Sequence, residues 1–190
     1  MDNETNKVHF DLTNVHVAPL TFEGGAHAFG APKRLPGAIS IDLAAQGNTV
    51  KLRADGIVYY STTSNSGYEG DLNLAMVPDW FRQEYLGESL SEKDKVLVEN
   101  VLADPAPFAL LYEFLGDKKH RRHVLYSCTA SRVSVKGENK ENQKDPDTEA
   151  LHLVSVPLPD GKVKASTTEA TPDAVYNAWN TTVWVSDSAQ

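Results

Sequence analysis

Apolar and polar residues alternate along much of this chain of 190 residues, and a period of two is the pattern of a β-strand. The run that follows the turn dipeptide Asp55-Gly56 is rich in β-branched and aromatic residues, which favour strands. Strict alternation would place Ile57 and Tyr59 on one face of this strand and Val58 and Tyr60 on the other. The sequence therefore predicts a strand that leaves the turn at residues 55–56.

Two similar patterns flank this strand. On its N-terminal side, alternation over residues 39–43 and 50–52 is interrupted by Gly47-Asn48, which predicts a hairpin that turns there. On its C-terminal side, Leu72, Leu74 and Met76 alternate with polar or small residues. One face of a second strand is therefore predicted to lie in the core.

A short helix is predicted after the second strand. Pro78 suits the first turn of a helix, because its missing N–H would be unpaired there, and Gly87 suits the position just beyond the last turn. Val77, Phe81 and Tyr85 recur at every fourth position, so one stripe of this helix is predicted to pack inward.

Residues 108–115 are apolar at most positions, and such a strand belongs in the middle of a sandwich or against a neighbouring subunit. Residues 18–37 are rich in glycine and show almost no periodicity, and residues 136–149 are charged and contain no large apolar side chain. Both segments are predicted to be long loops. A second short helix is predicted near residues 171–179.

These patterns together predict a mainly β fold, a β-sandwich or barrel-like domain with one or two short α-helices. A single domain over residues 1–190 is expected, with a short N-terminal arm at 1–7 and a polar C-terminal tail at 186–190. The N-terminal arm is expected to be mobile, because terminal residues are rarely tied down.

The net charge of −8, from 26 acidic and 18 basic residues, argues against a surface that grips nucleic acid or anionic lipid. No apolar stretch approaches the roughly 20 residues that a membrane-spanning helix needs, and the N-terminal sequence has no signal-peptide pattern. The protein is therefore expected to stay in the cytosol until it assembles or the cell lyses, with no membrane partner.

Four groups of residues could carry chemistry, and they are Cys128; His120 and His123; Glu69 and Asp71; and Asp145, Asp147 and Glu149. The cysteine lies in a strand-like run, where a small buried side chain is more typical than a nucleophile. The two histidines would point to opposite faces of a strand, and with the basic residues around them they favour a contact patch for an acidic neighbour. Metal binding by these histidines is the minor alternative.

The carboxylate pair would share one face of a strand, which is typical of a solvated or subunit-facing edge. The acidic triplet lacks the glycine and final glutamate of a calcium loop, so calcium binding is again the minor alternative. The sequence contains no nucleophile-elbow, Walker or dinucleotide-binding motif. It therefore predicts no catalytic, metal or cofactor residue, no cofactor and no enzymatic activity.

The order of the motifs resembles that of the major tail proteins of long-tailed, non-contractile bacteriophages, which form the tail tube. The residues that carry the resemblance are the strand after Asp55-Gly56; Ser64 and Ser66 before Gly67-Tyr68-Glu69-Gly70-Asp71-Leu72; and the proline-led helix with Phe81 and Leu86-Gly87. Further similar pieces lie at residues 14–20, 35–38, 121–132 and 176–184, so the resemblance covers most of the chain.

The resemblance implies a structural subunit that assembles into hexameric rings, which stack into a tube around a tape-measure protein. Tail terminator and distal tail or baseplate proteins would be the partners at the two ends of the tube. The tube would be the conduit for genome ejection, with viral DNA passing through without specific binding, and the protein would reside in the virion. An acidic lumen would repel DNA phosphates.

Ring-to-ring contacts need extended segments, and the expected ones are residues 18–37, residues 136–149 and the two termini. A tube of a prophage-derived particle would have the same sequence features as a virion tube. The alternative from another class is a small β-sandwich module that binds carbohydrate or a receptor through Tyr59, Tyr60 and Tyr68. Such a module is expected to stay monomeric, or to form a small closed oligomer, and to retain glycan.

Overall fold

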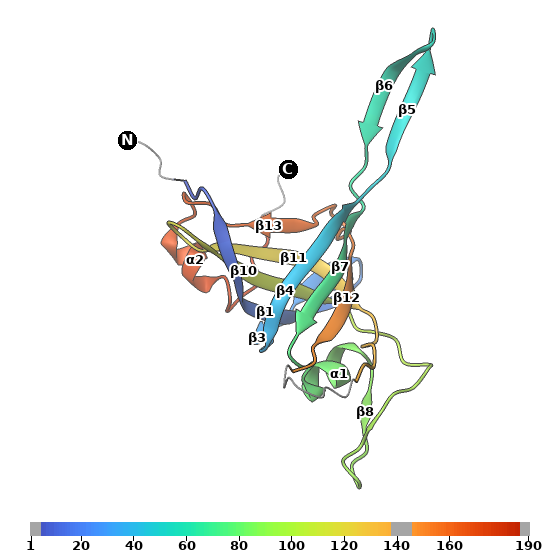
Figure 1. Ribbon diagram of the computed structural model, residues 1–190, viewed down its shortest axis with the longest axis vertical. Coiled ribbons are helices and arrows are strands. Elements are labelled where there is room, and N and C mark those ends of the chain that lie inside the picture. Colours follow the sequence, from blue (N-terminus) through green and yellow to red (C-terminus); the bar gives the residue numbers. More distant parts are fainter. Residues whose placement is uncertain (1–4, 138–145, 187–190) are drawn as a thin grey trace, which may run out of the picture.

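The structure is a computed structural model that describes residues 5–137 and 146–186, and it is mainly β with two short helices, as the sequence predicts (Figure 1). The strands are β1 (His9–Glu23), β2 (Ala26–Phe29), β3 (Lys33–Arg34), β4 (Ala38–Gln46), β5 (Thr49–Ala54), β6 (Ile57–Thr63), β7 (Gly67–Leu74), β8 (Ser89–Leu90), β9 (Leu97–Val98), β10 (Phe108–Gly116), β11 (Arg121–Ala130), β12 (Glu149–Ser155) and β13 (Lys164–Ser166). The helices are α1 (Asp79–Tyr85) and α2 (Asp173–Ala178).

Nine strands form one antiparallel sheet in the order β2-β1-β10-β11-β12-β7-β4, with β13 paired to β11 and β3 paired to β1. The sheet folds over on itself in a sandwich-like arrangement, so that β4 and β7 cross in front of β10 and β11 (Figure 1). Leu72 and Leu74 of β7 share one apolar core with Leu110 of β10 and Leu125 of β11. The sandwich body therefore has an interior of its own.

Strand β10 is buried on both faces, as its apolar sequence predicts. Phe108 and Leu110 belong to the larger core, whereas Ala109 and Leu111 belong to a second core completed by Trp179 after α2. All four of these β10 side chains are at most 1% exposed. Burying a large apolar side chain contributes roughly 1.5–3 kcal/mol, so this strand contributes strongly to the stability of the body.

Helix α1 also agrees with the sequence pattern. Val77, Phe81 and Tyr85 are buried, and the rings of Phe81 and Tyr85 both lie 5.0–5.5 Å from the ring of Phe108. Gly87 follows the helix with φ of +76°, a left-handed conformation that glycine adopts without strain. The helix thus covers one end of the larger core.

The long loop predicted at residues 18–37 is wrong, because most of this segment is strand. β1 continues through Pro19 to Glu23 and then turns at Gly24-Gly25 into β2. The carbonyl oxygen of Pro19 accepts a hydrogen bond from the N–H of Gly30 at 2.8 Å, and the N–H of Leu20 donates to Pro107 at 3.1 Å. Neighbouring groups therefore complete the pairing around a residue that cannot donate.

The hairpin predicted across Gly47-Asn48 is also wrong. β4 pairs with β7, and β5 pairs with β6, so the chain continues past Gly47 instead of reversing there. A side chain at Gly47 would collide with the carbonyl oxygen of Ser64, which shows that this glycine permits a close approach of two chain segments. Met76, predicted to be a core residue, is 68% exposed because β7 ends at Leu74.

The predicted loop at residues 136–149 lies largely outside the described residues, and its last residue begins β12. Most of the polar tail at 186–190 and of the arm at 1–7 also lies outside them. In the described part of the arm, the side-chain oxygen of Asn6 accepts hydrogen bonds from the N–H groups of Lys118 and Lys119 at 2.9 and 3.0 Å. This residue is therefore tied to the turn between β10 and β11.

Candidate assembly surfaces

Strands β5 and β6 form a hairpin that projects well beyond the sandwich body (Figure 1). Its turn is Asp55-Gly56, with φ of +52° and +79°, which are the left-handed angles of a two-residue hairpin turn. At its base, the hydroxyl groups of Thr49 and Thr63 lie 3.0 Å apart, within hydrogen-bonding distance. The turn predicted at residues 55–56 is thus confirmed, and it closes a hairpin with β5.

One face of this hairpin is apolar. Leu52 pairs with Tyr60 and Ala54 pairs with Ile57, and directly opposed residues of a ribbon share a face. Tyr59 is the extra residue of a bulge opposite Leu52 and Arg53, and the bulge breaks the strict alternation that would put Ile57 and Tyr60 on opposite faces. The apolar face carries Val50, Leu52, Ile57 and Tyr60 together with Thr62, and the opposite, more polar face carries Lys51, Arg53 and Ser61 together with Val58.

No described residue covers the apolar face. All 13 residues of the two strands are exposed except Ala54, and Leu52 and Tyr60 are each 57% exposed. A two-stranded hairpin alone in water is at best marginally stable and usually needs a further strand or a packed surface. The hairpin therefore has the properties of an element that is completed by another molecule.

A second exposed apolar segment lies between α1 and β10. Residues 88–104, here called the 88–104 arm, contain the two-residue strands β8 and β9 and extend from the α1 end of the body (Figure 1). Val101 and Leu102 are 80% and 84% exposed, and Val96 and Val98 are also exposed. The arm is held to the body by ion pairs, from Arg82 to Glu88 at 3.4 Å and from Arg132 to Glu99 at 2.9 Å.

The outward face of β4 and β7 is acidic. Glu69 and Asp71 share this face, as predicted, and the ring of His152 lies between them, with Nδ1 2.9 Å from Asp71 and Nε2 3.3 Å from Glu69. The hydrogen bond with Asp71, helped by Glu69, raises the pKa of His152 above its ordinary value. Asp42 pairs directly with Asp71 across the two strands and adds a third carboxylate.

The basic cluster predicted around His120 and His123 is divided by the structure. Arg122 turns inward, where its Nε lies 2.7 Å from the carboxylate of buried Glu113, and its guanidinium stacks on the ring of Tyr176. His123 stacks on the ring of Tyr112, with centroids 5.0 Å apart, and burial together with the charge of Arg121 lowers its pKa to about 4. His120 is about half exposed, and its Nδ1 lies 3.7 Å from Oε2 of Glu113.

Glu113 is a buried carboxylate with several polar partners, and the sequence analysis did not identify it. It is 3% exposed, and besides Arg122 its carboxylate accepts hydrogen bonds from the side-chain amides of Asn14 and Asn180, at 3.0 and 2.7 Å. These partners come from β1, β11 and the segment after α2. Glu113 thus ties three parts of the body together, and its signal in the sequence is one charge inside an apolar run.

Cys128 is buried, and burial raises the pKa of its thiol to about 12. A thiol in this state is neutral at physiological pH and is a poor nucleophile. The prediction of a small buried side chain at this position is therefore confirmed.

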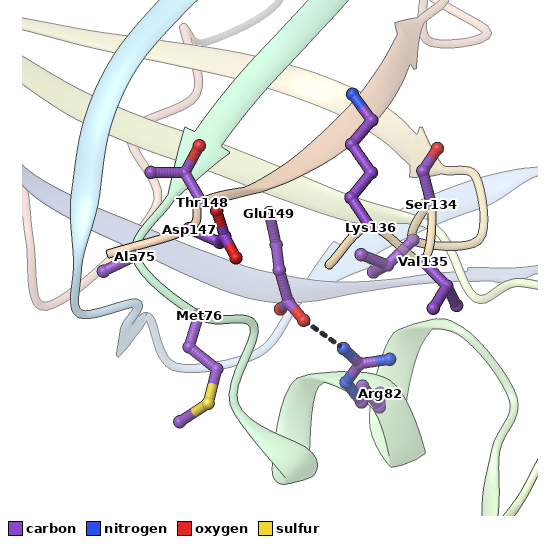
Figure 2. Close-up of a pocket in the computed structure, with 10 residues that line it drawn as sticks. Ala75, Met76, Arg82, Ser134, Val135, Lys136, Asp147, Thr148 and Glu149 are labelled. Atoms are coloured by element: carbon purple, nitrogen blue, oxygen red, sulfur yellow. Dashed lines mark hydrogen bonds and ion pairs between the residues drawn. The ribbon is translucent and has the colours of Figure 1, made fainter. Parts of the chain in front are cut away.

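A cavity of about 280 Å³ lies beside α1 and is lined in part by Met76, Val135 and Asp147 (Figure 2). Figure 2 shows Arg82 and Glu149 facing each other here, and their ion pair measures 3.0 Å. The other oxygen of Glu149 accepts the N–H of Val77 at 2.6 Å. These contacts anchor β12 to α1. Asp145, the first residue of the predicted acidic triplet, lies outside the described residues.

Within residues 5–137 and 146–186, no three histidine, cysteine or acidic side chains are grouped so that they could hold a metal ion. The same residues contain no helix that is long and apolar enough to cross a membrane. Tyr68, expected to join Tyr59 and Tyr60 in a binding platform, packs instead against Lys164, whose Nζ lies 2.8 Å from its hydroxyl group. Tyr60 belongs to β6 and Tyr68 to β7, and seven residues lie between them.

No family model matches this sequence, and no curated protein matches it either.

Proposed function

We propose that this protein is a structural subunit that polymerises with itself into the tail tube of a long-tailed, non-contractile bacteriophage. Hexameric rings of the subunit would stack around a tape-measure protein, end at terminator and distal tail proteins, and form the conduit for the genome. The motif order described above supports this family, and the apolar face of the β5–β6 hairpin is the structural observation that supports self-assembly. That face lacks cover among the described residues.

A covered position for the hairpin would remove several large apolar side chains from water at once. Val50, Leu52, Ile57 and Tyr60 are each 57–64% exposed, and burial of apolar surface is the main favourable term in association. A contact between different patches of identical subunits gives a closed ring when the rotation closes and a continuous stack when it does not. Both kinds of contact are needed in a tube of stacked rings.

The acidic face of β4 and β7 suits the wall of the lumen. Asp42, Glu69 and Asp71 would repel DNA phosphates, so that DNA passes without binding. A tube whose lumen is lined by basic residues would overturn this part of the proposal.

The test is negative-stain electron microscopy of the full chain over a concentration series, with sedimentation velocity on the same samples. Rings or hollow tubes that grow with concentration are expected. The double variant Leu52→Ser and Tyr60→Ser should abolish them, whereas Ser61→Ala on the polar face should not. A chain that stays monomeric throughout and retains glycan would overturn the proposal in favour of a carbohydrate-binding module.

A further inference from the structure

Two exposed apolar ribbons, the β5–β6 hairpin and the 88–104 arm, extend from this molecule. Both are short two-stranded ribbons whose outer edges have no paired strand among the described residues. Leu52 and Tyr60 are exposed on the hairpin, and Val101 and Leu102 are exposed on the arm. Contact between the two ribbons would remove apolar surface of both from water, which favours association.

The two ribbons extend from opposite ends of the body. The hairpin extends beyond the end at which β13 lies, and the arm extends beyond the end at which α1 lies (Figure 1). Within one copy they point away from each other, so they can meet only between copies. A contact between two different patches at opposite ends repeats from copy to copy and builds a stack instead of a closed dimer.

The charges of the two ribbons are complementary. The hairpin carries Lys51 and Arg53 against Asp55, whereas the arm carries five acidic residues against Lys93 and Lys95. Two of those acids, Glu88 and Glu99, pair with arginines of the body, and the arm remains negative after these pairs are set aside. Lys51 and Arg53 lie on the face of the hairpin opposite to its apolar face, so the opposite net charges of hairpin and arm would attract two copies at a distance and not across the contact itself.

We infer that the β5–β6 hairpin of one copy lays its apolar face on the 88–104 arm of the next copy along the stack. The occupant of both surfaces is thus a second copy of this chain. This inference rests on the proposed function, because it requires that copies assemble. It assigns the axial contact to residues 49–63 and 88–104, neither of which belongs to the segments that the sequence suggested for ring-to-ring contact.

Engineered cysteines can test this contact with little background. The native thiol of Cys128 is fully buried, so a short bis-maleimide linker should not reach it in the folded protein. Tyr60→Cys places a thiol on the apolar face of the hairpin, and Val101→Cys places one on the arm. Ser61→Cys on the polar face and Val156→Cys on the body are the matched controls, because both positions are exposed.

In assembled samples, a mixture of Tyr60→Cys and Val101→Cys should give linked dimers, and each variant alone should give few. The double variant in one chain should give a ladder of dimers, trimers and longer species. The same pairings with Ser61→Cys or Val156→Cys in place of Tyr60→Cys should remain mostly unlinked.

Links formed by Tyr60→Cys alone would mean that hairpins meet hairpins, and they would overturn the inference. Assembled material without hairpin-to-arm links would also overturn it and would leave the proposed function intact. Monomers at every concentration, seen by sedimentation and without links, would overturn both. Sedimentation therefore separates a failure of the inference from a failure of the proposed function.

Discussion

Strands β10 and β6 both contain several apolar and aromatic residues, but their surroundings are opposite. The first six residues of β10 are buried, whereas all seven residues of β6 are exposed. β10 has neighbouring strands on both edges and a core on each face, whereas in the described part of the chain β6 pairs only with β5. The same side-chain chemistry therefore stabilises the monomer in one region and is available for association in the other.

The largest expected difference comes from one change made in both regions. Leu110→Ala removes a fully buried side chain, leaves a cavity, and should lower the free energy of unfolding by about 3 kcal/mol. Leu52→Ala removes an exposed one and should change it by less than about 0.5 kcal/mol in the monomer. Urea unfolding of dilute monomer measures both values. Equal losses would show that the hairpin is already packed in the monomer.

Loss of the buried ion pair between Glu113 and Arg122 should lower the free energy of unfolding nearly as much. Glu113→Ala leaves the guanidinium of Arg122 without its carboxylate partner in a mostly buried position, and should cost about 3 kcal/mol. The matched change is Glu99→Ala, whose ion pair with Arg132 is exposed and should contribute less than about 1 kcal/mol. Thermal unfolding of both variants checks this order. A larger loss from Glu99→Ala would contradict it.

His123 should make the stability of the body depend on pH. Its pKa in the folded protein is about 4, below the ordinary value of 6.5, because it is buried. The unfolded chain therefore binds a proton first as the pH falls, and stability should drop by about 2 kcal/mol between about pH 7 and pH 5. His123→Phe should remove most of this part of the dependence in urea unfolding. An unchanged pH profile in that variant would show that other groups cause it.

The smallest expected effect lies on the exposed acidic face. Hydrogen bonds with Asp71 and Glu69 raise the pKa of His152, so their contribution is present at low pH and is lost as the pH rises through the raised value. Solvent screens this exposed cluster, so the effect on stability should be slight. An NMR titration of His152 should show the raised pKa, and Asp71→Asn should lower it. The same pKa in both proteins would contradict the observed contact.

The sequence predicts the elements of this fold better than their pairing. The helix with Phe81 and Tyr85, the two-sided strand β10 and the turn at Asp55-Gly56 follow from local periodicity and turn chemistry, which depend on neighbouring residues only. The partner of β5 does not, because Gly47-Asn48 and Asp55-Gly56 are both acceptable turns. The choice between them depends on β7, which pairs with β4.

The candidate surfaces were harder to predict for a physical reason. The residue types at 50–54 and 57–60 indicate strands, but whether the apolar face of these strands is covered depends on the rest of the fold. The sequence therefore directed attention to segments 18–37 and 136–149, which lack periodicity, while the structure leaves the apolar hairpin and the 88–104 arm uncovered. Glu113 was missed because its amide partners Asn14 and Asn180 are distant in the chain.

Amide hydrogen exchange on dilute monomer and on assembled protein tests the central comparison most directly. The account predicts that amides of β10 and β11 are protected in both samples, because their bonds lie inside the body. Amides of residues 49–63 and 88–104 should exchange quickly in the monomer and become protected in the assembly. Protection of residues 49–63 in the monomer, or rapid exchange there in the assembly, would contradict the role of the hairpin as an assembly element.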